Sequence, residues 1–352
     1  MESRVFSADE LRDLARRIFA AAGSGDGEAV TIATRLVKSN LVGHDSHGVI
    51  RIPRYWEWIK KGLVLPNRKV TFVLDRGPVA VLDGNSGFGQ STGEQTMEIA
   101  IDRARRHGCS MVGLRNTGHL GRIGDWPEMA TAAGMLSLHF VNTSGMGNLV
   151  APYGGKDRRL SANPIACGVP QREGPPLIMD MSACMIAEGK VRVALHKGVQ
   201  VPDGCLIDSE GLPTTDPELF YRHPPGSILP IAGHKGYVLS FMIEILAGAL
   251  TGGSCTNPAN AHKLANGMFT IVIDRSWFAD RDEFFDEVDR YIRYVKSSRT
   301  IDPDGEILVP GELEVRTSKR RTREGIPLAG TTIGQILQVC EELNIDSGRS
   351  TG

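Results

Sequence analysis

The chain has 352 residues, of which 41% are apolar, so it can bury a substantial core and its length predicts about two domains. Its 40 basic and 41 acidic residues are spread without blocks and give a net charge of -1, which argues against a nucleic-acid partner. The start lacks the apolar region of a signal peptide, and no stretch approaches the roughly 20 apolar residues that cross a bilayer, so we expect a cytoplasmic protein with no membrane partner. Six dispersed cysteines without a C-x-x-C pair predict reduced thiols.

The first 62 residues predict a small helical unit. Ser7 and Glu10 form a capping box in front of apolar residues at helical spacing. A second amphipathic helix begins near Gly27 and runs into the polar segment 43–48. A third helix follows from Val49, with a proline in its opening part, and stops at Gly62.

Residues 70–181 change to alternating strands and helices, which favours an α/β fold. Two short β-type runs at 70–74 and 79–82 predict a hairpin. Ser91 and Glu94 form a second capping box, which predicts the start of a helix that ends at Gly108. Further strands are expected at 111–114, 135–141, 165–169 and 177–181.

The last third of the chain predicts a long loop and several helices. Residues 198–230 are rich in proline, glycine and aspartate, and we expect a surface excursion without periodicity that covers a site or builds an interface. The longest apolar helix, 238–250, is expected to be buried. A strand at 268–274, a helix at 280–296, a short extended piece at 308–312 and a closing helix at 331–343 complete the pattern.

The segment 116–126 has the composition of a catalytic loop. Three glycines let the backbone approach a ligand, while His119 offers a proton and Arg122 a fixed positive charge. The alternative is a glycine-rich turn whose histidine only caps a neighbouring backbone group. This segment alone does not decide between the two.

A Rossmann dinucleotide site is not predicted. Gly145-x-Gly147 follows an expected strand, but the sequence after it continues as a loop instead of the helix whose N-terminus receives the pyrophosphate. A nicotinamide cofactor would therefore be held by a different kind of unit.

A metal site built from His44, His47 and His119 is the second hypothesis and corresponds to a metal-dependent lyase or hydrolase. Histidines three apart on a helix share one face, as zinc ligands often do. Because no second cluster of ligands is evident, we expect no metal.

Ten segments spread along the chain together resemble the malate/L-lactate dehydrogenase family, which is unrelated to the Rossmann lactate dehydrogenases. They are Gly43-His-Asp-Ser-His-Gly48, His119-Leu-Gly-Arg-Ile-Gly124, Asn163-Pro164, Gly189-Lys190, His196-Lys-Gly198, Pro202-Asp-Gly-Cys-Leu-Ile-Asp208, Pro213-Thr-Thr215, His234-Lys-Gly-Tyr237, Glu244-Ile-Leu246 and Leu308-Val-Pro-Gly-Glu312. The resemblance implies a homodimeric oxidoreductase that uses NAD or NADP to interconvert small 2-hydroxy and 2-oxo acids.

The resemblance also implies an architecture. It is an α/β, sulfolactate dehydrogenase-like fold with a mixed sheet, not a standard Rossmann fold. A small helical domain would comprise residues 1–68 and part of the C-terminal region, about 297–352. Residues 69–296 would form a mixed α/β domain that binds cofactor and substrate.

The same resemblance assigns site residues. His119 would transfer the proton, and His47 would contact the cofactor; we add His47 as a second catalytic candidate. The other implied cofactor contacts are Gly121, Arg122, Ile123, Ile178, Met179, Asp180, Met181, Ser182, His234, Gly311, Glu312, Leu313 and Glu314, and we add Lys235 beside His234.

Each remaining assignment has a simpler alternative. Arg51 and Ser46 are our candidates for the substrate carboxylate, because a guanidinium matches its two oxygens, although Arg51 would also suit a surface ion pair. Asp180 suits a ribose hydroxyl or, alternatively, a helix N-cap. His234 and Lys235 suit phosphate or ribose, or simply a solvated helix start.

Overall fold

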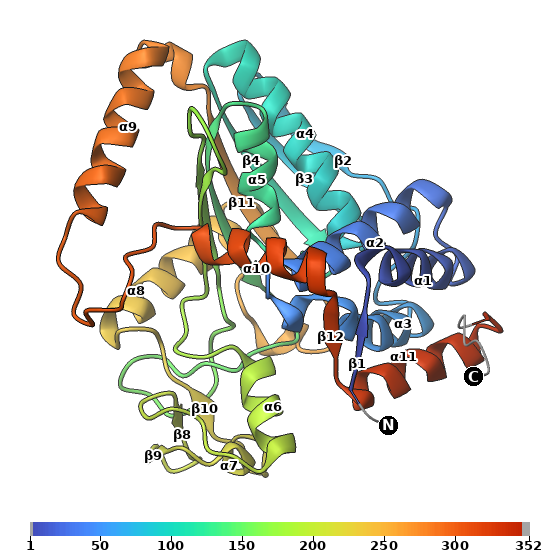
Figure 1. Cartoon of the computed structure of the whole chain (residues 1–352). Coiled ribbons are helices and arrows are strands. Elements are labelled where there is room, and N and C mark those ends of the chain that lie inside the picture. The colour runs from blue at the N-terminus through green and yellow to red at the C-terminus, as the bar shows by residue number, and fades with distance from the viewer. Residues whose placement is uncertain (1–2, 347–352) are drawn as a thin grey trace.

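A seven-stranded sheet forms the centre of the computed structural model, which describes residues 3–346 (Figure 1). The strand order is β2-β3-β4-β11-β5-β6-β7. Only β3 and β4 pair in parallel within this described sheet, so it is mixed, as expected, and differs from a Rossmann sheet. The strands are β2 (Thr71–Arg76), β3 (Val79–Asp83), β4 (Cys109–Thr117), β5 (Leu136–Thr143), β6 (Ile165–Val169), β7 (Leu177–Met181) and β11 (Asn266–Ile273).

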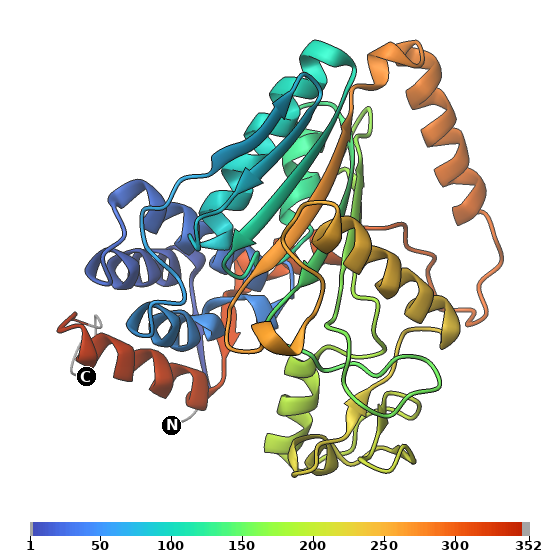
Figure 2. The same ribbon diagram turned by 180° about the vertical axis from the view of Figure 1, so that it is seen from behind.

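Helices cover both faces of this sheet. On one face lie α4 (Gly89–His107) and α5 (Asp125–Ala132), and on the other lies α8 (His234–Ile243), which continues as the π-helical turn η3 (Glu244–Ala249) (Figures 1 and 2). Apolar side chains of α4, α5 and the central strands share one buried cluster. The edge of the sheet where β4 and β5 end and β11 begins therefore has a rigid support.

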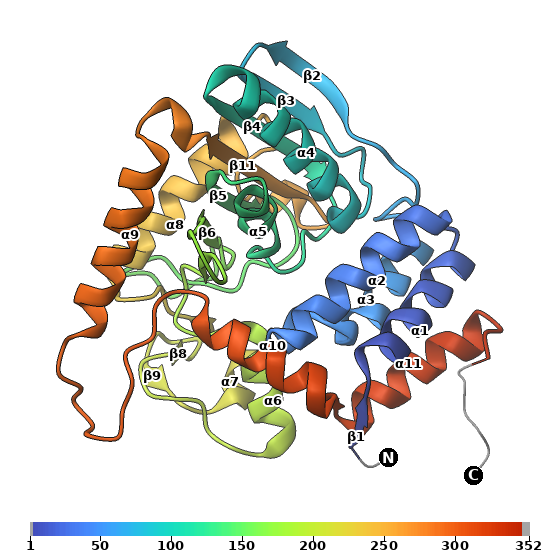
Figure 3. The ribbon, with the colours of Figure 1, turned by 45° about the horizontal axis from the view of Figure 1, so that its top comes forward.

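A helical unit packs beside the sheet (Figure 3). It combines α1 (Ala8–Ala21), α2 (Asp26–Leu41) and α3 (Ile52–Lys60) with β12 (Ile326–Leu328) and α11 (Gly330–Glu342) around one apolar cluster, and β1 (Arg4–Phe6) pairs with β12. The capping box at Ser7 is confirmed, since both of its hydrogen bonds are present. The predicted domain boundaries at residues 68 and 297 stay a prediction. Residues 1–2 and 347–352 of the predicted helical domain lie outside the described part of the chain.

Residues 198–230 are not the unstructured excursion that we expected. They contain the small sheet β10-β8-β9 and helix α7, which share an apolar cluster with α6 (Glu188–Lys197). The elements are β8 (Leu206–Ile207), β9 (Pro213–Thr214), α7 (Pro217–Tyr221) and β10 (Ser227–Ile228). Strands of two residues are too short to produce a periodic pattern, which is why the sequence did not reveal them.

Two further expectations fail, and one helix was not expected. Ser91 does not cap a helix, because α4 already begins at Gly89. The apolar helix near 238–250 is not buried, since Val238 and Phe241 on α8 are each about half exposed. The charged helix α10 (Glu312–Glu324) was not predicted, because its sequence lacks an apolar stripe.

Helix α9 (Arg281–Lys296) confirms the helix predicted at 280–296 and projects from the main body (Figure 1). Within residues 3–346, no helix combines the length and apolarity that crossing a membrane requires.

Candidate active site

Two 3-10 turns between α2 and α3 hold the first histidine of the site. They are η1 (Asp45–His47) and η2 (Val49–Arg51). Buried Asn40 fastens both turns, because its Oδ1 accepts from the amide of Val49 at 2.9 Å and its Nδ2 donates to Asp45 at 2.7 Å. A Cβ on Gly48 would lie 2.2 Å from Asn40 Oδ1, so the close fit requires glycine there.

The second histidine, His119, follows β4 on the predicted glycine-rich loop. The amide of the next residue, Leu120, donates to Asn266 Oδ1 at 3.0 Å, which ties the loop to the start of β11. The His47 and His119 rings stack with centroids 5.5 Å apart and an interplanar angle of 11°. The fold therefore brings together two histidines that are 72 positions apart in the sequence.

Each ring is oriented by a hydrogen bond to Nδ1. The Tyr55 hydroxyl lies 2.8 Å from Nδ1 of His119, and Gln90 Nε2 donates to that hydroxyl at 2.7 Å. The Ser46 hydroxyl lies 3.0 Å from Nδ1 of His47. Both histidines are half-buried, so each ring is enclosed on most sides.

Burial and positive charge make both rings poor bases in the free protein. Burial is the main cause that lowers the pKa of His47 to about 3, followed by the charge of Arg51. Burial, Arg51 and His47, in that order, hold the pKa of His119 well below its usual value. Burial raises the pKa of Tyr55 to about 12. Both imidazoles are therefore neutral at pH 7.

Arg51 stands beside the two rings. Its Nε donates to the main-chain oxygen of Ser46 at 2.6 Å, so the guanidinium faces the histidine turn and is not in the surface ion pair that was the alternative. Helix α6 packs onto this turn, and a Cβ on Gly189 would come within 3.0 Å of the Ser46 Cβ. An anion that reached Arg51 would therefore lie next to both histidines.

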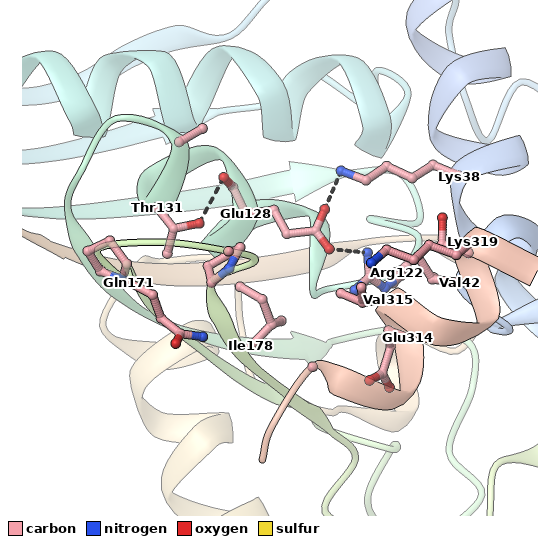
Figure 4. A pocket seen from close by; sticks show the side chains of 16 residues that line it. Lys38, Val42, Arg122, Glu128, Thr131, Gln171, Ile178, Glu314, Val315 and Lys319 are labelled. Atoms are coloured by element: carbon pink, nitrogen blue, oxygen red, sulfur yellow. Dashed lines mark hydrogen bonds and ion pairs between the residues drawn. The ribbon is translucent and has the colours of Figure 1, made fainter. Parts of the chain in front are cut away.

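A pocket of about 530 Å³ lies beside the loop that bears His119, which contributes Arg122 to its lining (Figure 4). Four of the predicted cofactor residues line it: Arg122, Ile178, Gly311 and Glu314. His44, which directly precedes the η1 turn that holds His47, contacts this lining, since its Nε2 lies 3.4 Å from Glu314; its Nδ1 lies 3.9 Å from Asp180. Its volume falls in the range of small-molecule and cofactor sites.

Arg122 is the buried charge at the base of this pocket. It binds Asp125 at 3.0 Å and Glu128 at 2.8 Å, and Asp180 lies 3.8 Å away. Burial lowers the pKa of Arg122, but the three carboxylates outweigh it and raise the pKa overall. Its Nε makes no hydrogen bond within residues 3–346, is shielded from solvent and faces Asp180 Oδ2 at 3.8 Å.

Asp180 does not cap a helix of its own. It lies in β7, and its Oδ2 accepts from the amide of Gly124, the residue before α5, at 2.8 Å. The N-cap alternative is thus wrong for α6, the helix that follows β7, because its N-cap is Ala187. The role of Asp180 in binding a ribose hydroxyl stays a prediction.

The remaining predicted cofactor residues are dispersed. Gly121 packs against Gln90, and Ile123 belongs to the sheet core. On β7, Ile178 faces the pocket, so Met179 and Met181 face the opposite side of the strand. The Ser182 hydroxyl donates to the carbonyl of Cys184. His234 and Lys235 are exposed at the start of α8, Leu313 is 60% exposed, and Glu312 ties Lys296 to the amide of Val309.

The three histidines of the metal hypothesis do not point at one common centre, although the rings of His47 and His119 stack. His44 turns to Glu314, His47 to Ser46 and His119 to Tyr55. No group of three or more histidine, cysteine, aspartate and glutamate side chains in residues 3–346 is arranged to hold a metal ion. The lyase or hydrolase alternative therefore has no geometric support.

Sequence reasoning missed Tyr55 and Gln90 beside His119, and Lys38 and Lys319 in the pocket. One signal was available for Tyr55, because it lies four positions after Arg51 and residues at that spacing face the same side of a helix. Gln90 offered no comparable signal, since only the tertiary structure brings α4 to α3.

Known proteins are similar to this chain in sequence and in fold. Residues 6–337 match the family model for malate/L-lactate dehydrogenase. Hydroxycarboxylate dehydrogenase B from Escherichia coli K12 is 41% identical over 92% of this chain and 90% of its own, which confirms the expected resemblance to the family. L-lactate dehydrogenase from Cupriavidus necator is 38% identical over 88% of this chain and 89% of its own.

The structure of sulfolactate dehydrogenase from Methanocaldococcus jannaschii superposes with a TM-score of 0.86 at 31% identity, over 98% of each chain. The expected sulfolactate dehydrogenase-like fold is thereby confirmed. The chain belongs to the malate/L-lactate dehydrogenase family, a family of oxidoreductases that act on hydroxy acids.

Proposed function

We propose that the protein is an NAD- or NADP-dependent oxidoreductase that interconverts a small 2-hydroxy acid and its 2-oxo acid, with His119 as general acid and base. The observation that carries the proposal is the stacked His47–His119 pair beside Arg51, together with a pocket of about 530 Å³ to which the His119 loop contributes Arg122. A bound nicotinamide supplies or accepts the hydride, and the protein must orient the substrate and move one proton.

The chain's residues divide this work. Arg51 binds the substrate carboxylate with its terminal nitrogens, while its Nε stays on the carbonyl of Ser46. Ser46 holds the ring of His47 and thereby keeps it beside the substrate. His119 takes the hydroxyl proton at Nε2 during oxidation and returns it to the carbonyl oxygen during reduction.

The pocket residues fit a nicotinamide dinucleotide. Arg122 places a positive charge in the pocket lining, and Gly311 has a φ of 93° and leaves room that a Cβ, 3.1 Å from the amide nitrogen of Ile178, would fill. Main-chain groups of residues 178 and 311 can therefore approach a ligand closely. Asp180 would receive a ribose hydroxyl.

The test is an assay of purified protein with a panel of 2-oxo acids, each with NADH and with NADPH. We expect oxidation of one reduced cofactor with at least one member of the panel. Absence of turnover across the panel, together with no change of NADH or NADPH fluorescence on mixing, contradicts the proposal. Activity that disappears after chelation and returns with zinc would instead favour the metal-dependent alternative.

We also propose a homodimer. Val238, Phe241, Met242 and Ile245 on α8 and η3, and Leu250 directly after η3, are 41% to 59% exposed, and α8 lies on the face of the sheet opposite α4 and α5 (Figure 2). A helix that is apolar on all sides is normally buried, and a second copy is the occupant that the family resemblance implies.

A reducing, cytoplasmic location is supported by six cysteines that are all free.

A further inference from the structure

A buried chain of three polar groups runs back from His119. It starts at Nδ1 of His119, passes through the Tyr55 hydroxyl at 2.8 Å and ends at the Gln90 amide, 2.7 Å further on. Tyr55 and Gln90 are each 1% exposed. Gln90 Oε1 makes no hydrogen bond within residues 3–346, so the amide has an unused acceptor beside its donor.

A hydroxyl has one proton, and this fixes the direction of the chain. When Gln90 donates to the Tyr55 oxygen, the Tyr55 proton points to Nδ1, and neutral His119 has its own proton on Nε2. When the Gln90 amide turns by 180°, its Oε1 accepts a hydrogen bond from the Tyr55 hydroxyl. The Tyr55 oxygen then accepts from an Nδ1–H group, and Nε2 presents a lone pair.

Both directions of the proposed reaction use the second arrangement, in which the Tyr55 oxygen accepts from Nδ1–H. Oxidation requires a lone pair on Nε2 to receive the hydroxyl proton, and the imidazolium that results keeps its Nδ1–H on Tyr55. Reduction starts from that imidazolium, which gives its Nε2 proton to the carbonyl oxygen and again keeps Nδ1–H on Tyr55. Without a partner for Nδ1, neutral His119 would divide between both tautomers, and part of the enzyme would present the wrong nitrogen.

We propose that Tyr55, supported by Gln90, is a positioning residue that binds Nδ1 of His119 and reserves Nε2 for proton exchange with the substrate oxygen. The proposal rests on the proposed role of His119 and adds to it the groups that select its tautomer.

The surroundings of Tyr55 allow a clean test. Its ring stacks on Trp58, with ring centroids 5.4 Å apart, and its centroid lies 6.2 Å from that of Phe19 and 6.1 Å from that of Phe88. Aromatic packing therefore holds the ring independently of the hydroxyl. Tyr55→Phe removes one oxygen and keeps these contacts. Phe19→Leu is the matched control, because it changes packing around the same ring and leaves the hydroxyl on Nδ1, whereas Trp58 also packs against His119 itself, with ring centroids 6.3 Å apart.

The sign of the expected pH effect follows from the groups around His119. The titratable or charged groups that face it are His47 on η1, Arg51 on η2 and Tyr55 on α3, while α4 and β11 present the amides of Gln90 and Asn266. A hydrogen bond from the imidazolium is charge-assisted and stronger than the bond to the neutral ring. Loss of the Tyr55 oxygen therefore favours neutral His119.

Tyr55→Phe is expected to lower kcat roughly tenfold to 100-fold, as for a lost hydrogen bond to a charged group. The acid limb of kcat/KM for oxidation should move to lower pH. Gln90→Met should move it in the same direction by less, since Tyr55 can still accept from Nδ1. Phe19→Leu should leave the limb in place.

A second measurement does not depend on turnover. In protein with ¹⁵N-labelled histidine, the NMR signals of His119, assigned by their loss in His119→Asn, report which nitrogen has the proton. Wild type should show one tautomer and Tyr55→Phe a mixture. An active wild type whose Tyr55→Phe variant keeps both its pH limb and its single tautomer overturns the inference and leaves the proposed function intact. No turnover of any 2-oxo acid by wild type is instead a failure of the proposed function.

Discussion

At the residue scale, substrate binding should change the charge balance around His119. In the free protein, burial and the charge of Arg51 keep this ring neutral. A 2-oxo acid brings a carboxylate to Arg51 and offsets part of that positive charge. The pKa of His119 is therefore expected to rise when the substrate binds.

This argument predicts a difference between two pH profiles. Reduction needs protonated His119, so its rate falls as pH rises through the pKa of that ring. The profile of kcat/KM reports the free enzyme, and that of kcat reports the complex. In stopped-flow or steady-state assays, the limb of kcat for reduction should lie at higher pH than the limb of kcat/KM. Coincident limbs would show that Arg51 does not meet the substrate carboxylate.

Replacement of His119 itself tests the proton transfer. His119→Asn retains a polar side chain but cannot exchange the proton, so kcat should fall roughly 100- to 10,000-fold, the usual contribution of general acid-base catalysis. The affinity for the reduced cofactor, measured by fluorescence titration, should stay nearly unchanged. His262→Asn, an exposed histidine, is the control and should keep full activity. Near-normal turnover of His119→Asn would make His119 structural and direct attention to His47.

At the element scale, the start of α4 sets the position of the His119 loop. A Cβ on Gly89 would lie 2.2 Å from the carbonyl oxygen of His119, a contact with backbone that no rotamer can relieve. We expect Gly89→Ala to reduce the free energy of unfolding by about 1–3 kcal/mol, as overpacking does, and to lower turnover roughly 100-fold through displacement of His119. Denaturant unfolding and steady-state kinetics measure the two effects.

Gly27→Ala is the matched control for Gly89→Ala. Gly27 lies in the first turn of α2, and a Cβ there would meet nothing within 4 Å. Its replacement should raise the free energy of unfolding by roughly 0.4–1 kcal/mol, because alanine restricts the unfolded chain, and should leave kcat unchanged. Equal behaviour of the two variants would mean that α4 does not constrain the loop.

At the scale of the whole molecule, the apolar face of α8 predicts the oligomeric state. Phe241→Glu places a charge in the middle of this face and should convert a dimer into a monomer, as measured by light scattering after size exclusion. The Leu212→Glu variant, in which the exposed residue before β9 is changed, should remain a dimer. A wild-type monomer, or a Phe241→Glu dimer, contradicts the assigned interface.

The sequence by itself determined the local elements whose signals lie within a few residues. The capping box at Ser7, the strands 165–169 and 177–181 and the glycine-rich loop with His119 all depend on neighbouring residues, and the structure has each of them. The family also followed from the sequence, because its short segments recur in order along nearly the whole chain.

Only the tertiary structure decided what meets across the chain. The stacking of His47 on His119 and the Gln90–Tyr55–His119 hydrogen bonds join α3, α4 and the loop after β4, and no sequence spacing encodes such contacts. Tertiary contacts also placed the start of α4 at Gly89, although Ser91 and Glu94 have the local pattern of a cap. The exposure of α8 has the same origin, since periodicity shows that a helix is apolar but not which of its faces the rest of the chain covers.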